Sequence, residues 1–343
     1  MTPAKFSSLR FGLGLLCLPC ARAVPVNPAN SGSRAPGVAT IYQTTPWEND
    51  TPLADLLSQA TVQNRADAQF NLGMVYYYGR GVPVDMKRAA QWLGRAAEQG
   101  HAQAQYRMGV ISEHGWGGMK PDPNDAIRWY RLSAEQGQPE AQNNLAVCYD
   151  HGDGIPVDYA EAMKWYHKSA EQGYASAQGN LGTMYDLGRG VKQDHSEAMK
   201  WYRLAAEQGD SGGEHNLALM YLNGLGVEQN LVEAAVWFRR AAEQGTAQSQ
   251  YNLGVLYRHG LGVGRDPAQA LHWYLQAANR GNVRAQSALA VMYRNGEGTP
   301  VDLEMSVKWA REAAEQGDAQ SQALLAEVLA IRKRVEKDQT KAK

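Results

Sequence analysis

Apolar and small residues recur along this chain with the spacing of an α-helix, in short segments that end at glycine. In one such stretch, Leu181, Gly182 and Tyr185 share one helical face. In the segment that follows, Ala198 and Trp201 begin a second apolar face. Each segment has about a dozen residues, which makes it marginal as an isolated helix in water. The pattern therefore predicts pairs of short helices that are stabilised by packing on one another.

Tryptophan marks a regular return of this arrangement along the sequence. The spacing is 37 residues once and 36 residues thereafter, over seven positions: Trp92, Trp129, Trp165, Trp201, Trp237, Trp273 and Trp309. A fixed period of this length indicates a stacked array of units that each contact only their neighbours. We therefore predict an all-α fold, an α/α superhelical solenoid of stacked helix–turn–helix repeats.

A small residue recurs in the middle of the first helix of every unit. These residues are Gly73, Gly109, Ala146, Gly182, Ala218, Gly254 and Ala290. Glycine inside a helix costs about 1 kcal/mol relative to alanine, so its recurrence predicts a close crossing of two helices. We expect tyrosine and tryptophan to fill the spaces between helices beside these small residues.

Four motifs recur together: an Ala-x-x-x-Leu-Gly-x-x-Tyr helix, a Gly-x-Gly-Val turn, an Ala-x-x-Trp-Tyr helix and an Ala-Glu-Gln-Gly close. In this combination the chain resembles the Sel1-like repeat family, a relative of the tetratricopeptide repeats. The resemblance covers seven units at residues 66–318. It departs locally in the second unit, which has Met108 for leucine, Ser112 for tyrosine and one extra residue in its turn. The resemblance implies a scaffold or adaptor that binds other proteins through a concave surface.

The segments outside the repeats divide by composition. Residues 52–65 match a degenerate second helix and residues 319–332 match a first helix, so both are expected to form caps. Residues 24–51 are rich in proline, glycine and serine and are expected to form a disordered linker. The charged tail at residues 333–343 is expected to fray.

Residues 1–23 have the composition of a secretory signal peptide. Lys5 and Arg10 precede a short apolar core, and Ala21-Arg22-Ala23 fits the small-x-small cleavage pattern. We therefore expect cleavage after Ala23 and a secreted or periplasmic protein. A cytosolic protein whose first residues resemble a signal by chance is the alternative. Of three cysteines only Cys148 would remain, as a small core residue within a helix.

The charge balance gives no reason to expect nucleic acid as a partner. The chain has 34 Lys and Arg against 35 Asp and Glu, a net charge of −1. We expect a protein or an extended peptide as partner, no nucleic acid and no membrane-spanning segment in the mature chain. The oligomeric state stays open.

Helical geometry suggests where such a partner would bind. In the first helix of each repeat, the residue before the motif leucine points away from the face that packs in the core. In six repeats this residue is polar: Asn71, Arg107, Asn144, Asn180, Asn216 and Asn252. Asparagine amides can bond to an extended peptide backbone, and the resemblance to tetratricopeptide arrays implies this use. Hydrogen bonding between neighbouring repeats is the alternative.

A second row, five residues after the leucine, changes from acidic to basic along the chain. It comprises Tyr77, Glu113, Asp150, Asp186, Leu222, Arg258 and Arg294. Such a row could orient a charged partner, and ordinary solvated side chains are the alternative. In the first two units the aromatic and thioether side chains would add binding hot spots if they were exposed, or they would pack under the N-terminal cap: Phe70, Met74, Tyr77, Tyr78 and Tyr106.

One string resembles a catalytic motif. Gly209-Asp210-Ser211-Gly212-Gly213 matches the sequence around a protease nucleophile, which requires a β-barrel loop or a strand-to-helix elbow. Here it falls in a turn between helical repeats. The Ser-x-x-Lys and His-Glu-x-x-His signatures are absent. We therefore expect no enzyme, no catalytic residue, no cofactor and no metal. A β-lactamase, or another hydrolase of β-lactams or peptidoglycan, is the alternative that family analogy offers.

Overall fold

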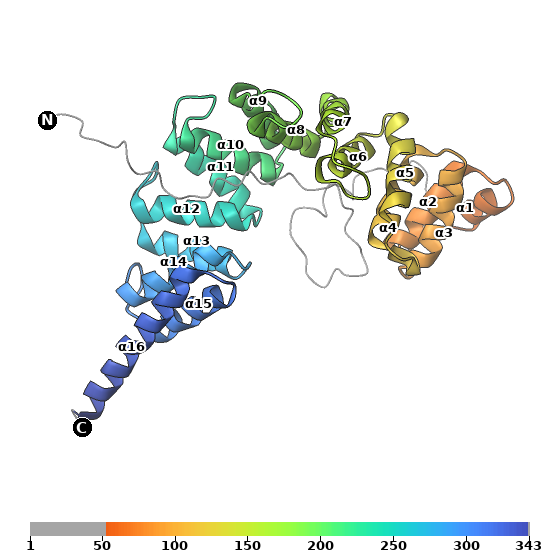
Figure 1. Cartoon of the computed structure of the whole chain (residues 1–343). Coiled ribbons are helices and arrows are strands. Elements are labelled where there is room, and N and C mark those ends of the chain that lie inside the picture. The colour runs from red at the N-terminus through yellow and green to blue at the C-terminus, as the bar shows by residue number, and fades with distance from the viewer. Residues whose placement is uncertain (1–52, 342–343) are drawn as a thin grey trace. The chain divides into compact units, whose positions relative to one another are not determined.

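The computed structural model describes residues 53–341, with side chains through residue 335, and this part of the chain is helical without any strand (Figure 1). The helices are α1 (Leu53–Thr61), α2 (Ala66–Tyr78), α3 (Met86–Glu98), α4 (Ala102–His114), the 3-10 helix η2 (Trp116–Gly118), α5 (Pro123–Glu135), α6 (Pro139–His151), α7 (Tyr159–Glu171), α8 (Ala175–Leu187), α9 (His195–Glu207), α10 (Ser211–Asn223), α11 (Leu231–Glu243), α12 (Ala247–His259), α13 (Pro267–Ala278), α14 (Val283–Asn295), α15 (Leu303–Glu315) and α16 (Ala319–Lys341).

Consecutive helices pack in pairs, which confirms the predicted repeat solenoid. The first helix of each repeat packs on the second, as α2 does on α3 and α8 on α9. The second helix then packs on the first helix of the following repeat, as α3 does on α4. The described residues group into two compact units, which are considered separately here: an N-terminal unit (residues 53–214 and 243–245) and a C-terminal unit (residues 215–242 and 246–341).

Side-chain caps and glycines set the ends of these helices. Most second helices begin at an aspartate whose carboxylate accepts a hydrogen bond from a backbone N–H of the first turn: Asp85, Asp122, Asp158, Asp194, Asp266 and Asp302. First helices end at a glycine with positive φ, for example Gly188 at 67°. The turns are therefore specified locally, before any contact between repeats.

The predicted close crossing is confirmed where glycine stands in the first helix. A Cβ atom added at Gly182 would lie 2.7 Å from Cδ1 of Tyr202, and one at Gly109 would lie 2.5 Å from Cδ1 of Tyr130. The ring belongs to the tyrosine that follows the tryptophan, and Tyr202 is completely buried. The tryptophans are buried less evenly, because Trp201 remains partly exposed. Tyrosine against a small residue is thus the central packing contact of a repeat.

In five of the seven repeats, a pair of glutamine side chains links the end of the second helix to the first helix of the same repeat. Gln99 donates a hydrogen bond to Gln69, Gln136 to Gln105, Gln172 to Gln142, Gln208 to Gln178 and Gln316 to Gln286. The first-helix glutamine in turn donates to a carbonyl oxygen of the preceding repeat, as Gln178 does to Ala170. We call this arrangement the glutamine clamp. It gives a structural role to the glutamine of the Ala-Glu-Gln-Gly close.

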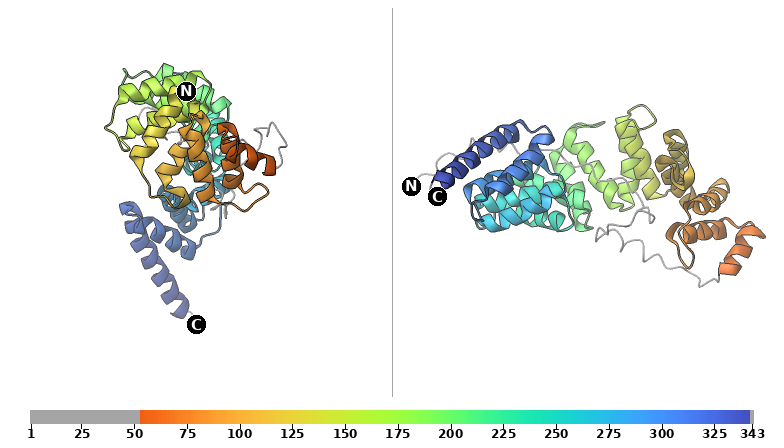
Figure 2. Two further views of the ribbon diagram at one scale, coloured as in Figure 1. Left: turned by 90° about the vertical axis from the view of Figure 1, so that its right-hand side faces the viewer. Right: turned by 90° about the horizontal axis from the view of Figure 1, so that it is seen from below.

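Helices also flank the seven repeats at both ends. α1 lies within the segment 52–65 that was expected to form an N-terminal cap. α16 begins at Ala319, as expected, but continues to Lys341 through the segment predicted to be a frayed tail. Figure 2 shows α16 extending past the end of α15. The expected signal peptide and linker lie outside the described residues, and no described helix is both long and apolar enough to cross a membrane.

Candidate protein-binding surface

The asparagine row is only partly accessible. Asn71 is exposed and Arg107 is half-buried. Four other members are buried, with at most 9% of their surface exposed: Asn144, Asn180, Asn216 and Asn252. The prediction that these residues point away from the core is therefore wrong for these four. A partner-binding role for these residues remains a prediction, and for the buried ones it would require the repeats to separate.

Neighbouring repeats explain this burial. Asn180 of α8 donates from Nδ2 to Oδ1 of Asn143 on α6 at 3.0 Å. Asn143 donates in turn to Oδ1 of Asn144 at 3.3 Å, and both residues are buried. Helical-wheel geometry identifies the face that points away from the second helix of the same repeat, but the first helix of the adjacent repeat covers that face. Here the alternative role in hydrogen bonding between repeats is the one the contacts support.

The second row, whose residues lie five positions after the motif leucine, also contacts the adjacent repeat. Asp150, whose side chain is 8% exposed, forms a salt bridge of 3.2 Å with Arg189. Arg189 lies between the two glycines of the turn in the next repeat. Three repeats after that of Asp150, in the C-terminal unit, Arg258 makes two hydrogen bonds of 2.8 and 2.9 Å with Glu297, which lies at the equivalent turn position. The two contacts are equivalent in position and opposite in charge.

Uncharged pairs occupy the same position at other interfaces. In the N-terminal unit, the ring of buried Tyr77 lies 6.2 Å from that of Trp116. In the C-terminal unit, Leu222 belongs to a core cluster against which Leu261 packs. We call these contacts, which join residues 39 apart in sequence, the turn pairs. These four turn pairs differ in chemistry, so the interfaces that they join are matched separately.

The remaining charged residues of the row also have intramolecular partners. Asp186, which is 7% exposed, lies 2.7 Å from Nδ1 of His195. Arg294 contacts Glu327 of α16 at 2.7 Å. Burial opposes the ionisation of Glu297, but hydrogen bonds from Arg258 and Asn295 hold the pKa of this carboxyl below its ordinary value. These intramolecular contacts explain the charged residues of the row without reference to a partner protein. A role of the row in binding remains a prediction.

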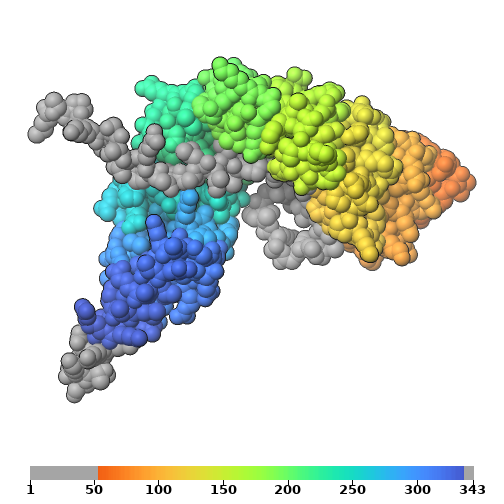
Figure 3. Space-filling view, in the orientation of Figure 1, coloured from red at the N-terminus to blue at the C-terminus, as the bar shows by residue number. Residues whose placement is uncertain are grey.

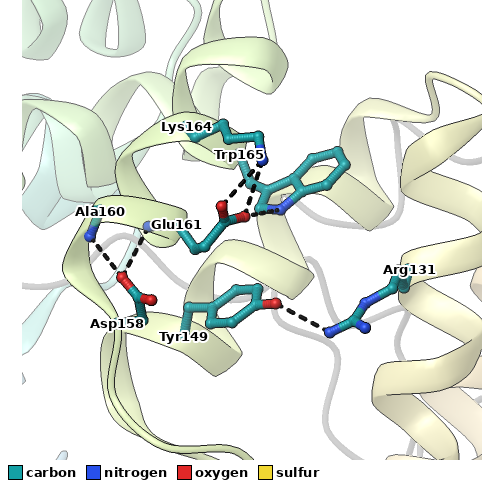
Figure 4. A network of polar contacts seen from close by, with 7 residues as sticks. All are labelled: Arg131, Tyr149, Asp158, Ala160, Glu161, Lys164 and Trp165. Atoms are coloured by element: carbon teal, nitrogen blue, oxygen red, sulfur yellow. Dashed lines mark hydrogen bonds and ion pairs between the residues drawn. The ribbon is translucent and has the colours of Figure 1, made fainter.

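A further contact between repeats was not anticipated from the sequence. The guanidinium of Arg131 on α5 donates to the hydroxyl of Tyr149 on α6 at 2.9 Å (Figure 4). On the adjoining α7, Glu161 accepts hydrogen bonds from Lys164 and from the indole nitrogen of Trp165, as Figure 4 also shows. The motif tyrosine therefore receives a polar partner from the preceding repeat.

A contact of this kind, between a basic side chain and the motif tyrosine of the next repeat, recurs in both compact units. His167 and Tyr185 are 3.2 Å apart, and Arg239 donates to Tyr257 at 2.6 Å. The arginine or histidine of each contact lies two residues after the tryptophan of its repeat. That spacing is the signal by which a sequence could have revealed the contact.

Aromatic side chains remain accessible on the first two repeats of the N-terminal unit. Five partly exposed residues on α2, α4 and η2 form what we call the N-terminal aromatic surface: Phe70, Met74, Tyr78, Arg107 and Trp116. Of the residues considered as exposed hot spots, Tyr77 and Tyr106 are instead buried, at 1% and 5% exposure. These two rings support the surface from beneath.

Arg107 and Trp116 lie over these buried rings. The Arg107 guanidinium carbon is 5.4 Å from the ring centre of Tyr106 and 5.9 Å from that of Tyr77. Trp116 packs against Tyr77 and against His114, whose ring centre is 4.8 Å away. Trp116 lies in the turn that carries the extra residue of the second repeat. It is one of two tryptophans outside the regular spacing. This departure from the regular spacing is the signal in the sequence that could have drawn attention to Trp116.

The string that resembles a catalytic motif forms a helix start. Oδ1 of Asp210 accepts a hydrogen bond from the backbone N–H of Gly213 at the beginning of α10. His215 is 1% exposed and bonds to Ser249 at 2.7 Å rather than to Ser211. Burial lowers the pKa of His215 to about 4. A buried, neutral imidazole at this site belongs to the core.

The described residues contain no cluster of three or more His, Cys, Asp or Glu that could hold a metal ion. Cys148 is 4% exposed within α6 and packs in the core of the N-terminal unit.

Comparison with known proteins agrees with the repeat geometry. Seven consecutive segments match the sequence model of the Sel1 repeat: residues 66–101, 102–138, 139–174, 175–210, 211–246, 247–282 and 283–318. The chain therefore belongs to the Sel1 repeat family, as its motifs predicted. Sel1 repeat proteins are protein–protein interaction scaffolds.

Two solved structures share the fold over most of the chain. One is c5321, described as a protective antigen of uropathogenic Escherichia coli with an SLR fold, which is 39% identical with a TM-score of 0.68 over 80% of this chain and 59% of that chain. The other is a Sel1 repeat protein from Oxalobacter formigenes, which is 34% identical with a TM-score of 0.67 over 80% of each chain.

A curated relative matches over a shorter region. It is the ERAD-associated E3 ubiquitin-protein ligase component HRD3A of Arabidopsis thaliana, which is 39% identical over 59 residues. The match spans 17% of this chain and 9% of HRD3A. The chain therefore matches only a small part of the length of HRD3A.

Proposed function

We propose that this chain is an exported scaffold that binds a partner protein through the N-terminal aromatic surface together with Asn71. The observation that carries the proposal is the placement of Arg107 and Trp116 above two buried tyrosines. Tryptophan, tyrosine and arginine dominate the energetics of protein interfaces when a rigid base supports them. Tyr77 and Tyr106 supply that base.

The position of this surface on first helices fits the concave side expected from the family. Farther along the chain, the equivalent asparagines are buried between repeats. Phe70 and Tyr78 add apolar area beside Asn71, whose amide can donate to and accept from a peptide backbone. The proposed partner is therefore a protein segment that places an apolar side chain near Trp116 and a hydrogen-bonding group near Asn71.

Export is supported by the signal-like residues 1–23 and by the likeness to an Escherichia coli protein described as a protective antigen. Intact-mass spectrometry of the protein purified from its native host tests export. The expected product begins at Val24, after loss of the first 23 residues. A product that retains residues 1–23 would refute export and leave the binding proposal to its own test.

Crosslinking followed by affinity purification from the envelope fraction tests the binding surface. We compare the wild-type chain with Arg107→Glu and with Trp116→Ala, and use Lys87→Glu as the control of matched charge change. Lys87 is exposed on the second helix α3. The proposal predicts a partner that both surface variants lose and the control retains. Identical partner lists for all four proteins would refute it.

A further inference from the structure

Two arginines of the sixth and seventh repeats have no acidic partner among the described residues. Arg265 lies in the turn before α13 and Arg284 in the first turn of α14, and both are exposed. Arg265 donates a hydrogen bond to the backbone carbonyl of Arg258 at 3.1 Å. Neither Arg265 nor Arg284 forms a salt bridge with a described carboxylate. These repeats belong to the C-terminal unit and are drawn in light to dark blue in Figure 3.

The arginines at the end of α12 share one carboxylate. Burial raises the pKa of Glu297, but hydrogen bonds from Arg258 and the charge of Arg265 contribute to holding it below its ordinary value. Burial lowers the pKa of His259, the last residue of α12, and the charges of Arg258 and Arg265 lower it further. The charge of Glu297 raises this pKa without reversing the shift. The electrostatic field at the end of α12 is therefore positive in spite of Glu297.

Arg284 extends the positive charge toward the start of α12. Tyr251 lies there, partly exposed, with its ring 5.7 Å from the buried ring of Tyr274. Burial raises the pKa of the Tyr251 hydroxyl, against the charges of Arg284 and Arg258. Tyr251 is therefore close to two cations, one on its own helix and one on the first helix of the next repeat.

The repeat itself requires neither unpaired arginine. At the position of Arg284, the six preceding repeats have Asp67, Gln103, Glu140, Ser176, Gly212 and Gln248. At the position of Arg265, the six other repeats have Val84, Pro121, Val157, Gln193, Gln229 and Val301. Like charges that lie close together repel one another, so the stability of the array does not explain these cations. Complementarity to a charged partner does.

The chemistry of this surface favours an acidic protein segment as the partner. A guanidinium group binds a carboxylate through two parallel hydrogen bonds. Binding of nucleic acid draws on many contacts to successive phosphates, whereas the unmatched charge here comes from two arginines beside Glu297. A short segment with a few carboxylates fits that charge, and protein partners are typical of Sel1 repeats.

We propose that the C-terminal arginine surface, formed by Tyr251, Arg265 and Arg284, binds an acidic segment of a partner protein through two carboxylates. Arg284 is equivalent in position to Gln248, ten residues before Arg258, whose carbonyl binds Arg265. Ten residues of helix rise about 15 Å, which an extended segment spans with about five residues. One carboxylate would bind Arg284 and the other Arg265, and the Tyr251 hydroxyl would donate to the segment between them.

A phage-displayed library of random peptides, selected against the full chain, tests the proposal. Some of the enriched peptides should lose binding to the Arg284→Glu and Arg265→Glu variants. These peptides should contain two Asp or Glu residues about five positions apart. In fluorescence anisotropy, the most enriched of them should bind the wild-type chain saturably and should bind Arg284→Glu at least tenfold more weakly.

Arg311→Glu is the matched control, because Arg311 is an exposed arginine of α15 that also forms no salt bridge with a described carboxylate. It should bind the peptide as the wild type does, and circular dichroism should show equal helicity for all variants. The Arg107→Glu variant should also bind the peptide normally, so this result is independent of the N-terminal aromatic surface.

Three kinds of result would overturn the proposal. One is that no enriched peptide depends on Arg284, or that the dependent peptides lack acidic residues. Another is an equal loss of binding in Arg284→Glu and Arg311→Glu, which would reveal a general effect of charge. The third is displacement of the peptide by inorganic phosphate at constant ionic strength, or tighter binding of a labelled single-stranded oligonucleotide that depends on Arg284. Either would identify a different anion as the occupant.

Discussion

Nε2 of Gln172, at the end of one second helix, donates a hydrogen bond of 2.7 Å to Oε1 of Gln142 on the first helix of the same repeat. Gln142 uses its own amide to donate to the carbonyl of Ala134 in the preceding repeat, at 3.1 Å. The glutamine clamp therefore satisfies a buried amide and fixes two successive repeats at once. A buried amide left without a partner costs about 1–3 kcal/mol.

The sixth repeat lacks the clamp, and this provides the first prediction. Arg280 stands where other repeats have glutamine, and it bonds to Gln276 instead. Oε1 of Gln250 is buried without a hydrogen-bond partner. Arg280→Gln should supply the donor and stabilise the protein by about 1 kcal/mol, seen as a higher urea midpoint. Arg311→Gln, at an exposed position of α15, is the control. An equal midpoint for the two variants would contradict the role assigned to the clamp.

The second prediction concerns the turn pair of Asp150 and Arg189. Asp150→Arg should destabilise the protein by about 2 kcal/mol, because two cations would then meet at a largely buried site. Adding Arg189→Asp should recover at least half of the loss, since the C-terminal unit uses the reversed arrangement at Arg258 and Glu297. A double-mutant cycle by chemical denaturation measures the coupling. The exposed pair of Glu161 and Lys164 should show a coupling of only a few tenths of a kcal/mol, and equal couplings for the two pairs would refute the prediction.

The third prediction compares two glycines inside helices. Gly94→Ala should stabilise the protein by about 0.5–1 kcal/mol, because alanine favours the helix and the nearest atom to an added Cβ is 3.9 Å away. Gly182→Ala should bring no such gain, because its Cβ would lie 2.7 Å from the ring of Tyr202. Thermal unfolding followed by circular dichroism distinguishes the two. A similar rise in Tm for both variants would show that the Tyr202 ring moves freely.

The fourth prediction concerns pH. Burial lowers the pKa of His215 to about 4 in the folded chain, from an ordinary value of 6.5. Below pH 6.5, His215 binds a proton in the unfolded chain but stays neutral in the folded chain. The free energy of unfolding therefore falls as the pH drops from 6.5 to 4. Between pH 7 and pH 5 this single group should lower the free energy of unfolding by about 2 kcal/mol.

Urea titrations at the two pH values measure this loss. His215→Gln should flatten the dependence on pH, whatever its effect on stability at pH 7. If the His215→Gln protein lost as much stability between pH 7 and pH 5 as the wild type, the buried histidine would not be the cause.

Local patterns predicted most of the fold. The spacing of Leu181, Gly182 and Tyr185 is a property of one helix, and the tryptophan period counts the units without knowledge of their packing. Burial of Asn144 could not be predicted in this way, because it depends on how far the next repeat is displaced. The same holds for Asp150, whose partner lies 39 residues away. Once that offset is known, the turn pairs can be found directly in the sequence.

The N-terminal aromatic surface was predicted only in part. Phe70, Met74 and Tyr78 were recognised as candidates, but Tyr77 and Tyr106 were not separated from them, because all five lie in first helices with similar local patterns. In the sequence, Trp116 differs from the other tryptophans of the repeats only by its irregular spacing. Its contact with Tyr77 follows from the turn-pair offset, which the sequence of a single repeat does not contain.

The differing chemistry of the turn pairs bears on how the gene can change in length. Tandem repeats are prone to lose whole units by unequal recombination between similar copies. Loss of residues 175–210 would join the third repeat to the fifth and set Leu225, the residue between the turn glycines there, against Asp150. A nearly buried carboxylate would then lack its cation. Deletion of the fourth repeat would therefore cost stability at the new interface between the third and fifth repeats.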